Sequence, residues 1–186
     1  MYLLVTGFYA FLSHLDYLYA AVAAYLCGCF NGALFTSRLF FHDDVRTHGS
    51  GNAGSTNMLR NYGKLPAVAT ILGDMAKVAV AILLVRLLVG NDLYAQQPIF
   101  IKSFAGLFCV LGHIFPCFFR FKGGKGVATC GGMVFMIDWR IALILLAVFF
   151  VSMYTDGYWW GVAGSVISVL AVNFAFRTPY FAFNFT

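Results

Sequence analysis

Charge is what this sequence has least of. Only 10% of its 186 residues are Asp, Glu, Lys or Arg, whereas a water-soluble domain carries about 25%. Hydrophobic residues make up 61% of the chain. This composition excludes an ordinary soluble domain and indicates an integral membrane protein.

Several features of other protein classes are also missing. The apolar stretch 1–16 lacks the positive start of a signal peptide, so it is either an interfacial segment or the start of the first span. No internal repeat or linker is visible, and 1–186 is therefore expected to form a single domain. No basic helical face appears, which argues against nucleic-acid binding.

The cysteines show neither disulfide nor metal-ligand spacing. All five lie in or beside apolar runs, and we interpret them as small buried hydrophobic residues. The Cys27-x-Cys29 pair has no His or second Cys pair near it. A metal site at this pair is therefore not favoured.

Long apolar runs predict an all-α, polytopic helical bundle. A span needs about 20 residues, and three runs reach that length: 17–41, 65–89 and 98–119. Shorter apolar runs follow at 127–137, 141–154 and 159–176. Within the first span, Gly28, Gly32 and Ala33 are small residues that allow close helix approach.

The cations predict the topology. Most of the 12 Lys and Arg residues fall in the loops after the first and third long spans or at the edges of those loops, and the connector 90–97 has none. These loop cations are Arg38, Arg46, Arg60, Lys64, Arg120, Lys122 and Lys125. The positive-inside rule places both loops on the cytoplasmic side, where they can build one site.

Several ionisable residues lie within the apolar runs, and three of them are candidates for a functional role. Asp74 and Lys77 are three apart and share a helical face. They form either part of a functional site or a structural ion pair that faces the bundle interior. His113 is either a hydrogen-bonded packing residue or a site residue near the second loop.

Both basic loops are rich in glycine. The first contains Gly49-x-Gly51-x-x-Gly54, which formally matches a dinucleotide fingerprint, but no strand precedes it. The second contains Lys122-Gly-Gly-Lys125-Gly, and neither loop holds a Walker A pattern. Glycines allow backbone N–H groups to turn toward an anion, so the loops are typical of a phosphate cradle. The alternative for the first is a solvated loop whose Ser, Thr and Asn cap the next helix.

Three motifs together resemble the bacterial membrane glycerol-3-phosphate acyltransferases that use acyl phosphate as donor, the PlsY family. The first motif is 49–57 with Leu59-Arg60, and the second is Asp74-x-x-Lys77. The third runs from Gly112-His113 through the Lys-Gly-Gly-Lys segment to Thr129.

The resemblance implies a seven-span helical enzyme, of which about six spans are visible, in the bacterial cytoplasmic (inner) membrane. Its site would face the cytoplasm and move an acyl group from acyl phosphate to glycerol 3-phosphate, beside membrane lipid and without a cofactor. Ser50, His113 and Lys125 are the implied catalytic residues. The expected substrate-binding residues are Ser50, Gly51, Asn52, Thr56, Asn57, Arg60, Lys122, Gly123, Gly124, Lys125 and Gly126.

The sequence departs from the family pattern at three places. Ser55 replaces the usual Ala, and Val78 replaces the usual Gly. After Phe176 there is no Arg-His-x-x-Asn-Ile-like motif, so the chain is expected to be short at its C-terminus and weakly active.

Two other function classes remain as alternatives at this stage. A phosphate or organic-anion transporter also binds anions in broken helices, although transporters commonly show repeats. A structural membrane protein has no need of glycine–lysine clusters on two loops.

Overall fold

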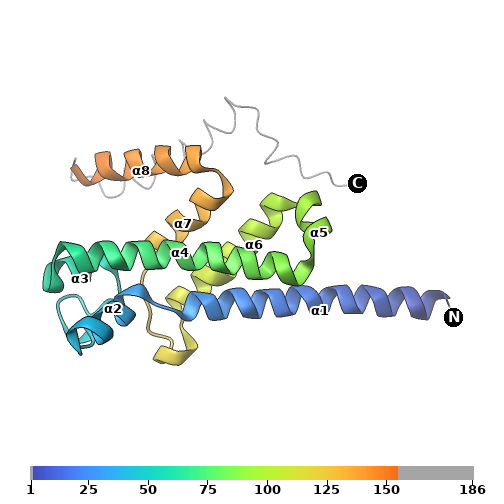
Figure 1. The fold of residues 1–186 in the computed structure, drawn as a ribbon, viewed down its shortest axis with the longest axis horizontal. Coiled ribbons are helices and arrows are strands. Elements are labelled where there is room, and N and C mark those ends of the chain that lie inside the picture. Colours follow the sequence, from blue (N-terminus) through green and yellow to red (C-terminus); the bar gives the residue numbers. More distant parts are fainter. Residues whose placement is uncertain (1, 155–186) are drawn as a thin grey trace. The chain divides into compact units, whose positions relative to one another are not determined.

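The computed structural model describes the backbone of residues 2–154 and the side chains of residues 15–148. The predicted apolar run 159–176 and the C-terminal tail lie outside the described residues. Within the described part every regular element is helical, which confirms the all-α prediction (Figure 1). The α-helices are α1 (Tyr2–Cys29), α2 (Gly32–Phe41), α3 (Ser55–Tyr62), α4 (Lys64–Val89), α5 (Asn91–Gln96), α6 (Pro98–Ile114), α7 (Val127–Ile137) and α8 (Trp139–Tyr154). Two 3₁₀ turns, η1 (Val45–Thr47) and η2 (Cys117–Phe119), lie in the two glycine-rich loops.

The chain divides into two compact units, residues 1–133 and residues 134–186. The first unit holds α1 to α6 and the first turns of α7. In the second unit, Asp138 separates α7 from α8 and accepts a 2.9 Å hydrogen bond from the backbone N–H of Arg140, which caps α8. Whether residues 1–186 act as a single acyltransferase domain stays a prediction.

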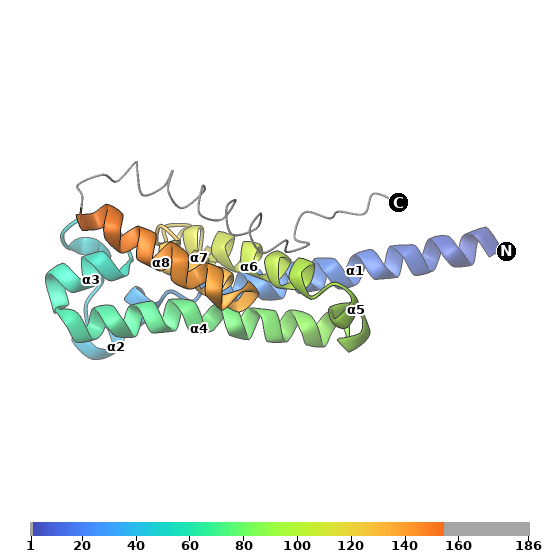
Figure 2. The ribbon, with the colours of Figure 1, turned by 90° about the horizontal axis from the view of Figure 1, so that it is seen from above.

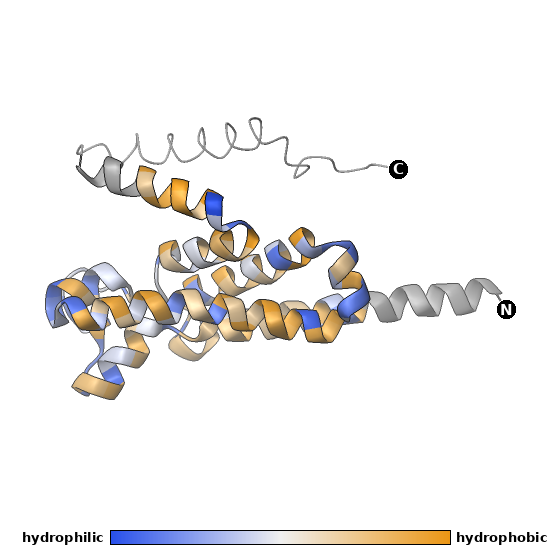
Figure 3. Cartoon of the chain, turned by 45° about the horizontal axis from the view of Figure 1, so that its top comes forward, coloured by the Kyte–Doolittle hydropathy of each residue, from blue (hydrophilic) through white to orange (hydrophobic). Residues whose placement is uncertain are grey.

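The described helices include clear membrane spans. Helix α4 and the segment Pro98–Phe119 are each long and apolar enough to cross a bilayer. The pair Leu15–Cys29 and Gly32–Phe41 passes the same test together but is bent by 41°. Figure 3 shows apolar residues along most of α4 and polar residues gathered in the loop that joins α2 to α3. The described residues thus supply two spans, or three if the bent pair counts as one.

The first span differs from its prediction in one respect. The apolar run 17–41 predicts one helix, whereas the structure breaks it at Phe30 and Asn31. Asn31 is the cause, because its extended backbone ends α1 and its side-chain oxygen accepts the N–H of Leu34, capping α2. The N-terminal stretch is helical from Tyr2 onward, so it continues directly into this span.

Glycines bring the three long helices together. Helices α1, α4 and α6 pack against one another (Figure 1, Figure 2). A Cβ atom on Gly28 would collide with the backbone of Cys109 in α6. One on Gly32 would lie 2.7 Å from the carbonyl oxygen of Thr70 in α4. The predicted role of these two glycines in close helix packing is confirmed.

Candidate functional site

The break between α1 and α2 exposes backbone groups inside an apolar bundle. The carbonyl of Phe30 and the N–H of Gly32 have lost their helical partners at this point. Side chains from the neighbouring helix replace those partners: Lys77 donates to the Phe30 carbonyl at 2.8 Å, and the Gly32 N–H donates to Asp74 at 3.1 Å. Non-helical backbone at membrane depth persists only when such partners are supplied by the protein.

Lys77 is fully satisfied by the groups around it. Its ammonium group carries three N–H donors and no acceptor. Its Nζ atom lies 2.8 Å from the Phe30 carbonyl oxygen, 2.9 Å from Asp74 Oδ1 and 2.6 Å from His113 Nδ1. Because the Lys77 ammonium group can only donate, Nδ1 of His113 is the acceptor in this bond.

Asp74, Lys77 and His113 therefore form one buried polar cluster. Their exposed fractions are 2%, 5% and 3%. Breaking a buried pair by removing one partner costs about 3–5 kcal/mol, because the other charge remains uncompensated. Of the two alternatives for Asp74 and Lys77, the geometry favours the structural ion pair. The cluster holds the helix break in place.

The first glycine-rich loop is folded around the side chain of Asn57. Its amide nitrogen donates to the carbonyls of Val45 (2.9 Å) and His48 (3.0 Å), and its oxygen accepts the N–H of Ser50 at 3.1 Å. Gly49 has a φ of 55°, and a Cβ there would collide with this oxygen. The amide of Asn57 thus shapes the loop from inside and is 2% exposed.

The second glycine-rich loop turns back onto the end of α6. The N–H groups of Gly123 and Gly124 donate to the carbonyls of Ile114 and His113, each at 3.2 Å. A Cβ on Gly124 would collide with His113 Nε2 and lie 2.6 Å from the carbonyl oxygen of Ala53. Only glycine permits this approach, which brings the second loop against both the first loop and the buried cluster.

Arg46 joins the two loops. Its guanidinium group grips Asp44 with two bonds of 3.0 and 2.7 Å and donates to the carbonyls of Phe119 and Lys122 at 3.3 Å. The hydrogen bonds from Arg46 hold the pKa of the Asp44 carboxyl well below its usual range. This cation is occupied by protein groups, and its role is to latch the loops together.

A cavity of about 70 Å³ lies where the two loops and the buried cluster meet. Its lining comprises Asn52, Gly54, Ser55, Thr56, Asp74, His113, Lys125, Gly126, Val127 and Ala128. Helix α3 begins at Ser55 and helix α7 begins at Val127, so two helix N-termini open onto this cavity. The first N–H groups of a helix have no acceptor within it, and the helix dipole favours an anion there.

Lys125 completes the lining of this cavity. In the part of the chain that the structure describes, its ammonium group makes no hydrogen bond or ion pair, and it is exposed. The one acid in the lining, Asp74, is compensated by Lys77. Neither α3 nor α7 has an acidic residue in its first turn. The lining is therefore suited to an anion.

The structure gathers some of the predicted site residues and leaves others apart. Those that line the cavity are Asn52, Thr56, His113, Lys125 and Gly126. Ser50 and Gly51 lie at the exposed tip of the first loop, and Arg60 and Lys122 are exposed without a charged partner among the described residues. Gly123 and Gly124 shape the second loop, as Asn57 shapes the first.

Sequence reasoning missed the backbone donors of α7. Val127 and Ala128 reach the site through the start of their helix, while their side chains carry no polar group. The available signal was the change from glycine and lysine to an apolar run at Val127, which predicts a helix start. Ser55, which departs from the family pattern and carries one of the hydroxyls of the first glycine-rich loop, also lines the cavity.

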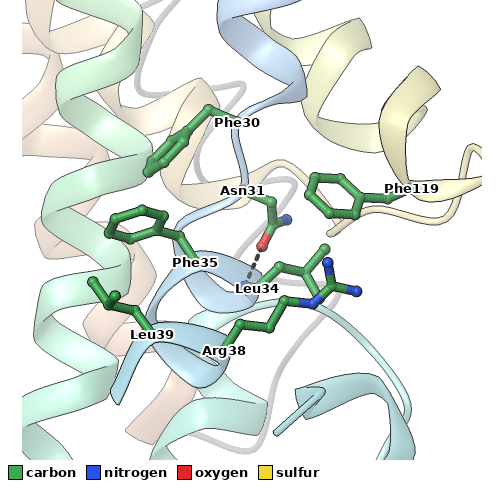
Figure 4. Close-up of a pocket in the computed structure, with 7 residues that line it drawn as sticks. All are labelled: Phe30, Asn31, Leu34, Phe35, Arg38, Leu39 and Phe119. Carbon is green, nitrogen blue, oxygen red and sulfur yellow. Dashed lines mark hydrogen bonds between the residues drawn. The ribbon is translucent and has the colours of Figure 1, made fainter. Parts of the chain in front are cut away.

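A second, larger pocket of about 410 Å³ lies beside the helix break (Figure 4). Its lining is formed by Phe30, Asn31, Leu34, Phe35, Arg38, Leu39 and Phe119. Figure 4 shows Asn31 between the Phe30 and Phe119 side chains, with its oxygen directed at the start of α2. Since most of this lining is apolar, the pocket suits a hydrocarbon rather than a phosphate.

Comparison with known proteins places the chain in a family. The model of a family described as glycerol-3-phosphate acyltransferase matches residues 18–185. The glycerol-3-phosphate acyltransferase of Pseudomonas putida is 45% identical over 134 residues, which cover 72% of this chain and 67% of that relative. The enzyme of the same name from Francisella tularensis subsp. holarctica is 43% identical over 125 residues, covering 67% of this chain and 58% of that relative.

Solved structures give the same result. The crystal structure of PlsY, an integral membrane glycerol 3-phosphate acyltransferase, in its glycerol 3-phosphate form has a TM-score of 0.67 and 30% identity. That match covers 88% of this chain and 79% of the other. The lysophosphatidic acid form gives a TM-score of 0.56 at 26% identity, covering 87% and 90%. The resemblance carried by the three motifs is confirmed: the chain belongs to the glycerol-3-phosphate acyltransferase family and is a multi-pass membrane acyltransferase.

Proposed function

We propose that this protein transfers a fatty acyl group from acyl phosphate to the 1-hydroxyl of sn-glycerol 3-phosphate, giving lysophosphatidate and inorganic phosphate. The observation that carries the proposal is the cavity that the N-termini of α3 and α7 share with Lys125, which has no partner among the described residues. Both substrates bring a phosphate group to such a site. Family membership favours this reaction over the phosphate transporter that the loops alone left open.

The chemistry requires charge stabilisation and positioning. The hydroxyl oxygen attacks the acyl carbonyl carbon, and the bond from that carbon to the phosphate oxygen breaks. The hydroxyl proton passes to a phosphate oxygen of the substrates, so no protein base is assigned. Lys125 and the helix N-termini stabilise the charge on the departing phosphate. Holding two reactants in line supplies about 7–11 kcal/mol of such a barrier.

The remaining site residues extend this cradle. Ser50, Gly51 and Arg60 are proposed to meet a phosphate at the outer edge of the first loop, and Lys122 at that of the second. Arg60 is suited to a bidentate grip on phosphate oxygens. His113 contributes by position, because its ring lies between Lys77 and the Gly124 backbone.

The decisive assay uses the purified chain in lipid vesicles. Acyl phosphate and radiolabelled glycerol 3-phosphate should yield labelled lysophosphatidate and inorganic phosphate in equal amounts. Acyl coenzyme A in place of acyl phosphate tests the donor. Transfer from acyl coenzyme A alone would keep the acyltransferase and overturn the proposed donor. Movement of glycerol 3-phosphate into vesicles without acylation would favour a transporter.

The proposal places the site at the cytoplasmic face of the inner membrane, on the strength of the cations in both loops. In a cysteine-free background, Thr47→Cys and Lys122→Cys should react with an impermeant maleimide from the cytoplasmic side, and Asn91→Cys from the outside. Lys122 is exposed, which makes it a better labelling position than Gly124, where a side chain would collide with His113. Labelling of the two loops from opposite sides would overturn the shared site.

A further inference from the structure

Two cysteines that are far apart in the sequence meet at the helix break. The Sγ atoms of Cys29 and Cys117 lie 3.7 Å apart, although 88 residues separate them. Cys29 is the last residue of α1 and is 1% exposed, whereas Cys117 opens η2 and is half-buried. Among the described residues, Cys27, Cys109 and Cys130 have no thiol neighbour of this kind. The short distance between the two sulfur atoms sets this pair apart from the other three cysteines.

Contacts around the pair keep the two thiols close to each other. Gly112 of α6 packs so closely on α1 that a Cβ there would collide with the Tyr25 carbonyl and lie 2.9 Å from the Cys29 N–H. The hydroxyl of Tyr25 donates to the carbonyl of Phe115 at 2.7 Å. Two contacts thus fasten the end of α1 to the end of α6 beside the thiols. The packing of α1 on α6 therefore places Cys29 beside the start of the segment that carries Cys117.

We propose that Cys29 and Cys117 are a redox-modification site whose co-reactant is a small disulfide such as oxidised glutathione. Cys117, the more accessible thiol, attacks that disulfide, forms a mixed disulfide and releases one thiol. Cys29 then displaces the second thiol. In balance, two protein thiols and one small disulfide become one protein disulfide and two small thiols. A disulfide requires an S–S distance of about 2.05 Å, so the sulfur atoms approach by less than about 2 Å.

The new bond would join two parts of the candidate site. Cys29 immediately precedes the break, where the Phe30 carbonyl binds Lys77. Cys117 begins the loop that leads to Lys125, which lines the cavity. A bond between them restricts the second glycine-rich loop relative to the break. We expect oxidation to lower acyl transfer reversibly, and this expectation rests on the proposed function, whereas the thiol chemistry does not.

The test counts thiols and maps the bond before it measures activity. The full chain, purified in detergent under reducing conditions, is incubated with oxidised glutathione, denatured and alkylated with a maleimide. Intact mass should show that two of the five thiols are lost and no glutathione is retained. Proteolysis without reductant should yield one cross-linked peptide pair containing Cys29 and Cys117. Acyl transfer should fall about fivefold or more and return with dithiothreitol, as expected for thiol–disulfide exchange.

Matched variants distinguish the possible failures. Cys29→Ser and Cys117→Ser should each abolish the bond, whereas Cys130→Ser should still lose two thiols. Retention of all five thiols, a stable glutathione adduct, or a bond between two chains would overturn the proposal. A Cys29–Cys117 bond with unchanged acyl transfer would overturn its regulatory part. If the reduced protein shows no transfer, the proposed function fails while the mapped bond still stands.

Discussion

The buried cluster of Asp74, Lys77 and His113 adjoins the cavity that Lys125 lines. Protein groups compensate the charges in the cluster, whereas the charge of Lys125 has no such partner among the described residues. At the helix break, Lys77 has three protein acceptors within 2.9 Å, and its charge is cancelled by Asp74. At the cavity, Lys125 has no partner among the described residues, and two helix N-termini add to its positive potential. His113 and Asp74 contribute to both regions.

The difference separates structural charges from binding charges in a membrane protein. All cations are scarce here, so scarcity alone does not identify a site. A charge that the protein compensates stabilises the fold, and its loss should lower thermal stability. A charge that the protein leaves open is available for a ligand, and its loss should lower affinity. Variants in the buried cluster should therefore lower the melting temperature, whereas variants at the cavity should weaken substrate binding.

The largest effect is expected from Lys77→Ala. Removing this ammonium leaves Asp74 buried without its countercharge and the Phe30 carbonyl without a donor. Loss of one partner of a buried pair destabilises by about 3–5 kcal/mol. The melting temperature of the purified protein should fall sharply, together with activity. The double variant Asp74→Ala/Lys77→Ala should be less destabilised than the sum of the single variants. If the destabilisation of the double variant equalled the sum of the two single effects, Asp74 and Lys77 would not act as one cluster.

A smaller effect is expected from Asn57→Ala. The change removes three hydrogen bonds that hold the first loop, to the carbonyls of Val45 and His48 and from the N–H of Ser50. Each contributes about 0.5–1.5 kcal/mol. Hydrogen–deuterium exchange of the backbone amides in this loop should accelerate, and the Tm of the protein should fall. Thr56→Ala is the control, because Thr56 lines the cavity without holding the loop. If Asn57→Ala raised KM alone, with Tm unchanged, the amide would belong to the binding region instead.

The sequence predicts the helices well and their meeting points poorly. Apolar runs predict α4 and the 98–119 span because each run is about as long as a helix must be to cross a bilayer. The break at Phe30 and Asn31 stays hidden, since the run remains apolar and only the capping chemistry of Asn31 marks it. Likewise, the three-residue spacing predicts the Asp74–Lys77 pair, but nothing local places His113 or Cys117 beside their partners.

The candidate site follows the same pattern. Its glycine-rich loops, its cations and its family motifs are all visible in the sequence. The sequence does not show which residues line the cavity, because that depends on how two loops from different parts of the chain pack. Asn57 is an example. Its sequence context predicts phosphate binding, whereas in the structure its side chain is buried and hydrogen-bonds to the backbone of the loop.

Arg60→Lys should act on the binding side alone. Arg60 is exposed and makes no protein contact that its loss would break in the described structure. Lysine keeps the positive charge but cannot form bidentate hydrogen bonds to a phosphate group. We expect KM for glycerol 3-phosphate to rise about tenfold at most, the equivalent of about 1.4 kcal/mol, with Tm unchanged. A loss of Tm without a change in KM would move Arg60 to the structural group.

The smallest effect concerns the latch between the loops. The pKa of Asp44 is depressed by Arg46, so its contribution to stability is complete above the ordinary value of 3.8 and is lost as the pH falls below it. Between pH 5 and pH 3, the wild type should lose more thermal stability than Asp44→Asn. Equal losses in the two proteins would show that the latch contributes nothing.

Titration of glycerol 3-phosphate into the purified protein and into its Lys125→Ala variant, followed by calorimetry, tests the central claim most directly. The claim is that the open cation at the cavity binds substrate phosphate. Kd should rise by about tenfold or more in the variant, the equivalent of about 1.4 kcal/mol, while Tm without ligand remains that of the wild type. An unchanged Kd, with the protein folded, would contradict it.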